Sequence, residues 1–150
     1  MTMIKKIFNK LFNKTPNNTI SFQPGFDLTS LPVITLYQGE KKFNFLLDTG
    51  SNNSIIDGNI LDQIEHTVLN DKTALYGLEG ISNVRSMCKI KLYYKDDGYE
   101  YTYVIADMKK PFDNIKAETG VTLHGLLGSK FFNAYKYVLD FDELIAYSKK

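Results

Sequence analysis

The chain has 150 residues, 43% hydrophobic and 23% charged, which is typical of one folded domain and excludes a disordered chain or a coiled coil. Its formal net charge of +1 gives no strong overall attraction to nucleic acid or to acidic surfaces. Cys88 is the single cysteine, so an intrachain disulfide is excluded, and with two histidines the chain is a poor candidate for a structural zinc site. We therefore expect no metal and no cofactor, and the lone thiol fits a reducing, cytoplasmic compartment.

Residues 1–14 predict an amphipathic helix with a basic polar face. Its apolar residues recur at helical spacing, at Ile4, Ile7, Phe8, Leu11 and Phe12. Such a helix packs on its own domain or on a second copy, or it makes a weak contact with a membrane surface and associates the protein peripherally with it. Polar residues interrupt each apolar run, so we expect neither a secretory signal peptide nor a membrane span. Residues 15–30 are rich in Pro, Asn and Gly and predict an extended linker.

From Leu31 the pattern changes to short strands separated by tight turns. In chain order the sequence predicts a strand at residues 33–37, a turn at 38–41, a strand at 43–47 that runs into Asp48, a short strand at Ile55 and Ile56, and a short helix through Ile60, Leu61, Ile64 and Val68. The next elements are a hairpin of residues 90–94 and 99–106 around an Asp-Asp-Gly turn, a loop over 107–124 around Pro111 with a strand near Val121, a helix over 129–135, and strands over 137–141 and 144–147. This order predicts a mainly β fold, a small barrel or folded-over sheet with one or two short helices.

The segment from Phe45 to Ser51 has the clearest chemical signal in the chain. An apolar strand delivers the carboxylate of Asp48, and Gly50 turns the chain directly afterwards, since glycine permits backbone shapes that other residues resist. Thr49 and Ser51 place hydroxyl groups on either side of this glycine. The Asp-Thr-Gly tripeptide alone is also compatible with an Asp and a Ser that stabilise an ordinary turn.

In its context, this segment resembles the active-site motif of the retropepsin-like aspartic proteases, in which apolar residues lead into Asp-Thr/Ser-Gly-Ala/Ser. The family has a second, apolar-Gly-apolar-apolar-Gly segment followed by a short helix and closing strands. The similar segment here reads Leu123, His124, Gly125, Leu126, Leu127 and Gly128. Between the two lies a glycine-bearing flap hairpin, which is similar here to Tyr76, Gly77, Leu78, Glu79, Gly80 and Ile81. The resemblance covers residues 31–148. His124 departs from it, because that position is often apolar, and we expect this side chain to be structural or exposed.

The resemblance implies a closed, barrel-like retropepsin fold and an aspartic endopeptidase that acts on peptide or protein substrates. Such enzymes need two carboxylates that share a proton. The chain has one complete motif, because Asp57-Gly58 and Asp97-Gly98 lack the hydroxyl residue in between. The second carboxylate is therefore expected from another copy, in a homodimer whose twofold axis passes through the site and supplies Asp48 twice.

The family also implies roles for the neighbouring residues. Thr49 braces the paired loops across the dimer, and Gly50 lets the backbone approach the catalytic pair. Ser51 is expected to donate a hydrogen bond to the carboxylate and shift activity to lower pH. Gly77 and Gly80 belong to the flap that closes over substrate. The glycines of the second segment, Gly125 and Gly128, allow tight packing beneath the active-site loop.

Other interpretations remain open at this point. A catalytically silent retropepsin-like domain that binds peptides or only dimerises is the main alternative, because a fold does not guarantee activity. Cys88 lacks a histidine-based constellation, which argues against a cysteine protease. Alternating tyrosines and lysines in the hairpin at 89–103 are typical of core and solvated face, so we expect no nucleic-acid binding. Asp140 and Asp142 are interpreted as a solvated strand end and not as a second carboxylate pair.

Overall fold

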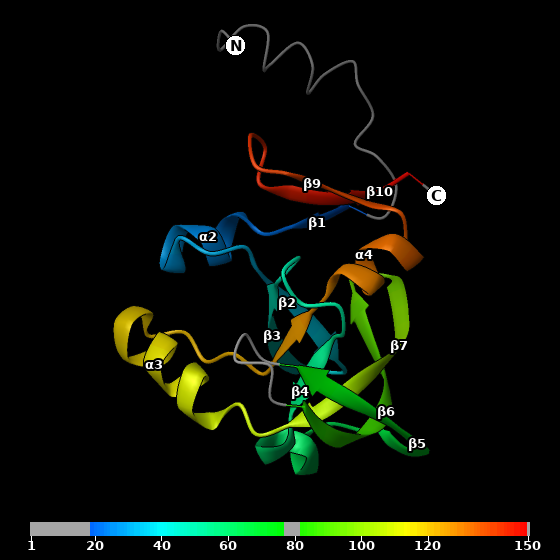
Figure 1. Ribbon diagram of the computed structural model, residues 1–150. Helices are drawn as coiled ribbons and strands as arrows, with labels where there is room; N and C mark the ends of the chain where they lie inside the picture. Colours follow the sequence, from blue (N-terminus) through cyan, green and yellow to red (C-terminus); the bar gives the residue numbers. More distant parts are fainter. Residues whose placement is uncertain (1–18, 77–81, 150) are drawn as a thin grey trace, which may run out of the picture.

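The computed structural model describes residues 19–76 and 82–149 (Figure 1). The predicted amphipathic helix at 1–14 and most of the predicted flap segment, residues 77–81, lie outside the described residues. Within the described ranges, no helix has the length and apolar character needed to cross a bilayer.

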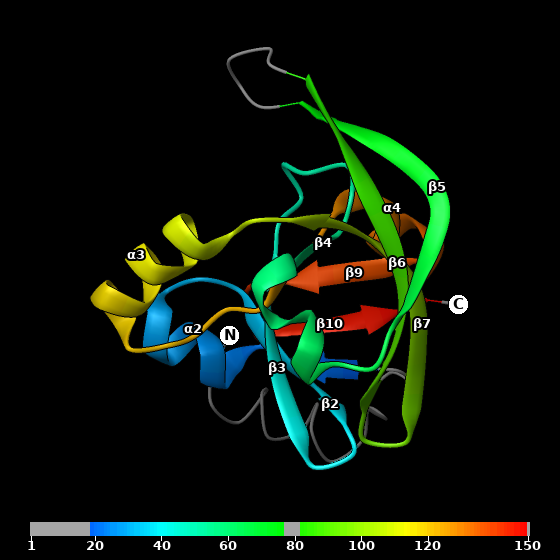
Figure 2. The ribbon, with the colours of Figure 1, turned by 90° about the horizontal axis from the view of Figure 1, so that it is seen from below.

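A closed barrel of six strands forms the body of the molecule, as Figure 2 shows from below. Its strands, in spatial order, are β2 (Val33–Gln38), β3 (Lys41–Leu47), β8 (Gly125–Leu127), β4 (Ile55–Asp57), β7 (Asp97–Ala106) and β6 (Ser82–Tyr94). Pairing of Tyr37 with Tyr93 joins β2 to β6 and closes the ring. Strand β5 (Thr67–Tyr76) pairs with β6 outside this ring. The mainly β, barrel-like fold predicted from the sequence is confirmed.

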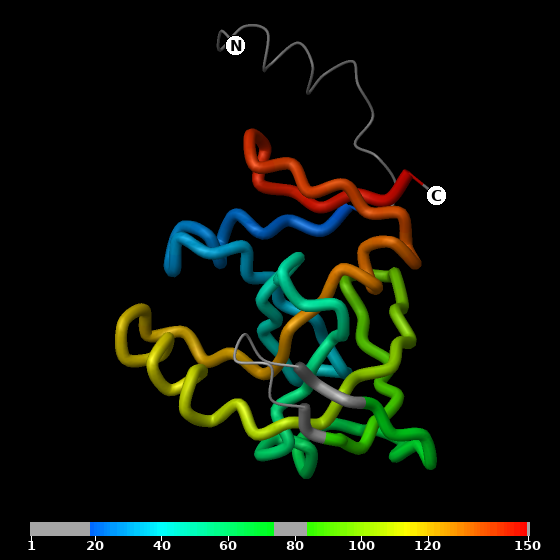
Figure 3. The backbone as a smooth tube through the Cα atoms, in the orientation of Figure 1, coloured from blue at the N-terminus to red at the C-terminus, as the bar shows by residue number. Residues whose placement is uncertain are grey.

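A second, three-stranded sheet joins the two ends of the described chain. Its order is β1 (Thr19–Ser21), β10 (Ile145–Ser148) and β9 (Tyr137–Asp140), and all pairs are antiparallel. The tube in Figure 3 shows the early and late segments lying side by side above the barrel. Residues 19–29, expected as part of an extended linker, instead form β1 and helix α2 (Gln23–Thr29). The reason is burial, because Ile20 and Phe22 are 1% and 0% exposed in the core.

Neighbouring barrel strands bury side chains on both faces. One face contributes to a main cluster that includes Phe45, Leu47, Ile56, Tyr103 and Leu127. The opposite face contributes to a smaller set, here called the outer cluster, which consists of Val33, Ile55, Val104, Phe112, Leu123 and Leu126. Because side chains alternate along a strand, adjacent residues enter different clusters, and both faces of this part of the sheet are apolar.

Helix α3 (Lys109–Thr119) occupies most of the segment that was expected to be a loop, and Val121 lies outside any strand. The prediction relied on Pro111, but this proline is the third helical residue, within the first turn, where a missing N–H costs little. The helix ends at Gly120, whose φ of 78° is a left-handed conformation that glycine adopts without strain. The short helix predicted through residues 60–68 is also shorter than expected: a 3-10 helix, η1, spans Gly58–Gln63, and Val68 belongs to β5.

The remaining predicted elements are confirmed within one or two residues at each end, except that β6 begins at Ser82, eight residues before the predicted start at residue 90. They are β2, β3 and β4, the β6–β7 hairpin, helix α4 (Ser129–Ala134), and strands β9 and β10. In the turn after β9, the Asp140 carboxylate accepts hydrogen bonds from the backbone N–H groups of Asp142 and Glu143. Asp140 therefore stabilises a strand end, as the sequence indicated.

Candidate active site

Asp48 follows the last residue of β3, and its carboxylate is held by the turn that comes next. Its backbone N–H donates to Leu127 O at 2.9 Å, which continues the β3–β8 ladder one residue beyond β3. The Gly50 N–H donates to Asp48 Oδ1 at 3.0 Å. Asp48 is half-buried, whereas Thr49 and Gly50 are exposed. The loop therefore presents a fixed carboxylate with two accessible residues beside it.

The Ser51 hydroxyl is hydrogen-bonded to the loop backbone and not to the Asp48 carboxylate. It donates to Asn53 O at 2.7 Å, so the predicted hydrogen bond from Ser51 to Asp48 is wrong for this structure. The Ser51 carbonyl accepts a 2.7 Å bond from the backbone N–H of Ser129, the first residue of α4. A hydroxyl and a peptide carbonyl of the same residue thus fix the shape of the loop and tie it to α4.

The two glycines of the second segment pack against the strand and loop that surround Asp48. A Cβ on Gly128 would lie 2.5 Å from Asn53 O and 2.7 Å from Ser51 O. A Cβ on Gly125 would lie 2.5 Å from both Ile55 O and the Phe45 ring. Real Cβ atoms do not approach other atoms so closely, and any larger residue would push the loop away from β8.

Ser54 is a supporting residue that sequence reasoning missed. It is 2% exposed, and its Oγ accepts a 3.0 Å hydrogen bond from the Gly128 N–H. Its backbone carbonyl accepts a 2.8 Å bond from Val104 N. A hydroxyl residue directly before the apolar pair Ile55–Ile56 was the available signal, because a buried hydroxyl needs a partner.

The predicted flap lies between two paired strands. Tyr76 is the last residue of β5 and pairs with Ser82, the first residue of β6, so the strands on either side of residues 77–81 form a long antiparallel hairpin. Gly77, Leu78, Glu79, Gly80 and Ile81 themselves lie outside the described residues. Their role at the site stays a prediction.

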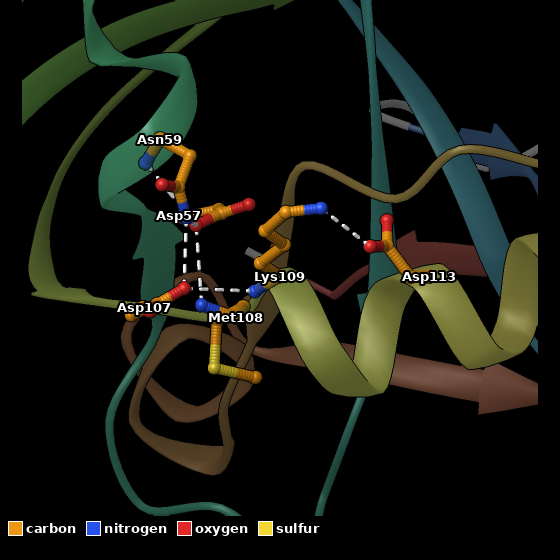
Figure 4. A network of polar contacts seen from close by, with 6 residues as sticks. All are labelled: Asp57, Asn59, Asp107, Met108, Lys109 and Asp113. Atoms are coloured by element: carbon orange, nitrogen blue, oxygen red, sulfur yellow. Dashed lines mark hydrogen bonds and ion pairs between the residues drawn. The ribbon is translucent and has the colours of Figure 1, made fainter.

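A polar network lies at the far end of β4, nine residues beyond Asp48 in the chain (Figure 4). Asp57 is 5% exposed, and its Oδ1 accepts from Asn59 N at 3.2 Å, Asn59 Nδ2 at 2.8 Å and Met108 N at 3.1 Å. Asn59 Nδ2 also donates to Asp107 Oδ1 at 2.8 Å. Hydrogen bonds from the Lys109 backbone and from Asn59 lower the pKa of the exposed Asp107 carboxyl. The network fixes the starts of η1 and α3 on the end of β4.

His124 is half-buried and structural. Its ring Nδ1 accepts a 2.9 Å hydrogen bond from the Asn44 backbone N–H, and the His124 backbone N–H donates to Asn44 O at 2.8 Å. An accepting Nδ1 requires the neutral ring, and burial lowers the pKa of His124, opposed by the nearby Asp57 charge. The imidazole therefore fastens the segment before β8 to β3.

Other reactive groups are placed unfavourably for catalysis. Cys88 is 0% exposed, and burial raises the pKa of its thiol to about 11, so it is a core residue and a poor nucleophile. Tyr99 and Tyr103 are also core residues. Among the described residues, no three or more His, Cys, Asp or Glu side chains gather into a group able to hold a metal ion.

The loop, the glycine segment and the barrel around them agree with one known family. The family model for retroviral aspartyl proteases matches residues 29–139, which include Asp48 and its loop, the β5–β6 hairpin and the glycines at 125 and 128. A comparison with curated proteins finds no significant match. The family match covers well over half of the chain, and the barrel has the topology expected for it: the chain belongs to the retroviral aspartyl protease family.

Proposed function

We propose that the chain is an aspartic endopeptidase that acts as a homodimer, with Asp48 of each copy in one shared site. The observation that supports this most directly is the setting of Asp48: a half-buried carboxylate fixed by the Gly50 N–H, with Thr49 and Gly50 exposed beside it. The Ser54–Gly128 hydrogen bond and the hydrogen bond from the first residue of α4 to Ser51 O fix the loop that carries Asp48.

The chemistry needs a second carboxylate close to the first. Among the described residues, no hydrogen bond links another carboxylate to Asp48. A second copy related by a twofold axis supplies the partner, and two close carboxylates then retain one proton between them because both cannot ionise readily. The ionised member takes a proton from a water molecule, and the protonated member polarises the scissile carbonyl.

The first test compares the chain with Asp48→Asn on a diverse peptide mixture from acidic to neutral pH, reading new termini by mass spectrometry. Asp62→Asn is the matched control, since Asp62 is exposed on η1. Cleavage by the native chain and the control that is lost in Asp48→Asn is the expected result. Equal cleavage by all three proteins would place the active site elsewhere. No cleavage by a folded, dimeric native chain would favour the silent, peptide-binding alternative.

A mixing experiment tests the shared site itself. Native and Asp48→Asn chains are combined in equal amounts and allowed to exchange partners. If both carboxylates are required, random pairing leaves roughly a quarter of the activity of the same total amount of native chain. If one carboxylate per chain suffices, half of the activity remains. Sedimentation of the same samples establishes that dimers are present.

A further inference from the structure

The three-stranded sheet of β1, β10 and β9 has two faces with different surroundings. Ile20, Ala146 and Leu139 lie directly opposite one another across the three strands, and all three belong to the main cluster or pack against it. This face of the sheet is therefore turned toward the barrel. The residues next to these three along each strand point the other way, because side chains alternate in a strand.

The opposite face of this sheet, here called the upper face, carries the apolar side chains of Val138, Ile145 and Tyr147. Val138 and Tyr147 are direct cross-strand partners, and Ile145 lies two residues before Tyr147 on β10. Each of the three is half-buried, and none belongs to either apolar cluster. In Figures 1 and 3 the sheet is the top layer of the described chain, with the barrel below it. No described helix or strand covers the upper face.

One end of the upper face is acidic. Asp140 is the direct partner of Ile145, and Asp142 and Glu143 follow it as exposed residues in the turn between β9 and β10. Residues 138–148 contain no Lys or Arg that would balance these three carboxylates locally. A segment that covers the upper face therefore needs an apolar surface with positive charge near this turn.

The first 14 residues of the chain have the matching chemistry. Their apolar side chains recur at helical spacing, and their charged side chains are four lysines with no Asp or Glu. Two of these lysines, Lys5 and Lys6, lie in the N-terminal half of the segment. A helix of this length is marginal in water by itself, so it needs an apolar surface to stabilise it.

The connection between this segment and the sheet is short. Residues 15–18 read Thr-Pro-Asn-Asn, residue types that favour a turn, and they span at most about 14 Å before β1 begins at Thr19. Strand β1 runs from Thr19, opposite Tyr147, to Ser21, opposite Ile145. A chain reversal at residues 15–18 therefore returns the segment along β1, with its N-terminal half toward the acidic turn. A short tether gives an effective concentration on the order of millimolar, which favours this segment over a second copy.

We propose that residues 1–14 dock as an amphipathic helix on the upper face of their own chain. Their apolar side chains cover Val138, Ile145 and Tyr147, and Lys5 and the N-terminal amine face the carboxylates of the β9–β10 turn. The docked segment makes a fourth layer element that closes the sheet from above. The interaction is a property of the single folded chain and does not depend on peptidase activity.

Hydrogen exchange of the full-length chain, read by mass spectrometry on peptides from residues 1–14, tests the docking. The native segment is expected to exchange at least about 10-fold more slowly than the same segment in Val138→Asp, because a carboxylate on the upper face disfavours apolar contact. Val68→Asp is the matched control, since Val68 is 60% exposed on β5, and it should keep the native protection. Phe8→Asp removes the contact from the segment side, and Asn9→Asp, on its polar side, is the control for that variant.

The barrel amides in the same spectra establish whether each variant is folded. Unprotected exchange of residues 1–14 in the native chain overturns the proposal, and so does equal protection in the native chain, Val138→Asp and Phe8→Asp. Protection that appears only at high chain concentration assigns the upper face to a second copy, and protection that appears only with anionic lipid vesicles assigns the segment to a membrane surface. Either result also overturns the proposal. If Val138→Asp does not fold, the comparison of Phe8→Asp with Asn9→Asp decides.

Discussion

The backbone N–H of Gly128 donates a 3.0 Å hydrogen bond to the side-chain oxygen of Ser54, across 74 positions of sequence. This bond joins the strand after the Asp48 loop to the glycine segment, beneath the candidate catalytic loop. Both residues are buried, so water cannot replace either partner. The shape of the Asp48 loop depends on a hydroxyl that does not touch the carboxylate.

Ser54→Ala leaves the Gly128 N–H buried without its acceptor. We expect the free energy of unfolding to fall by about 1–3 kcal/mol, measured by urea denaturation. Ser86→Ala is the control, because Ser86 is exposed on β6 and its loss should change stability little. Equal stability of the two variants would show that the Ser54–Gly128 bond contributes nothing net.

Ser51→Ala should leave the pH dependence of cleavage unchanged. The Ser51 hydroxyl donates to Asn53 O, so its removal does not alter the hydrogen bonds to the Asp48 carboxylate. The measurement is kcat/KM against pH for the native chain and the variant. A profile displaced along the pH axis would mean that the hydroxyl turns to the carboxylate in the dimer.

Gly125→Ala should destabilise the protein strongly, by about 3 kcal/mol, because overpacking here meets groups that cannot move. The added methyl would lie 2.5 Å from Ile55 O, a backbone atom, and 2.5 Å from the buried Phe45 ring. Gly98→Ala is the control: its nearest neighbours are the side chains of Tyr93 at 3.0 Å and Lys91 at 3.2 Å, both exposed. Thermal unfolding of both variants gives the comparison, and similar losses would contradict the packing role.

His124 should make the folded state sensitive to mild acid. Its pKa is lowered in the folded state, so folding favours the neutral ring. The stabilisation is present above the ordinary pKa of 6.5 and is lost as the pH falls from there through the lowered folded value. The groups that face the ring are Asp57, the Asn44 N–H and the Phe43 ring, which lies 5.3 Å away.

The measurement is the melting temperature between pH 8 and pH 5 for the native chain and His124→Phe. The native chain should lose stability on acidification more steeply than His124→Phe. Parallel curves for the native chain and His124→Phe would show that His124 is not the source of the acid sensitivity.

Much of the barrel was predictable because its strands alternate in the sequence. Phe43, Phe45 and Leu47 mark one buried face of β3, and the β6–β7 hairpin shows a glycine-bearing turn between two such runs. Strand β1 was missed because it has three residues and its partner, β10, lies at the other end of the chain. Helix α3 was missed because its stability comes from packing on the outer cluster, while its local sequence is polar and contains Pro111.

The candidate site likewise contains residues that local sequence patterns identified and residues that they missed. Asp48 and the glycine segment were identified from local patterns, because the chemistry fixes residue types at short spacing. Ser54 was missed, since the need for it comes from a backbone N–H far away in sequence. Ser51 was assigned to the wrong acceptor, because several oxygens lie within reach of its hydroxyl in one turn. Which of them accepts the hydrogen bond depends on the backbone geometry of the turn, which the sequence does not specify.

The three-stranded sheet has a consequence for the timing of activity. Strands β1, β10 and β9 pair within one chain, so the first and last described strands find their partners without a second copy. Formation of this sheet needs no second copy, whereas assembly of the proposed dimer is a second-order encounter between two chains. Under dilute conditions the amount of the proposed active dimer would grow with the square of the chain concentration. Proteolytic activity would then stay low until the newly made chain accumulates.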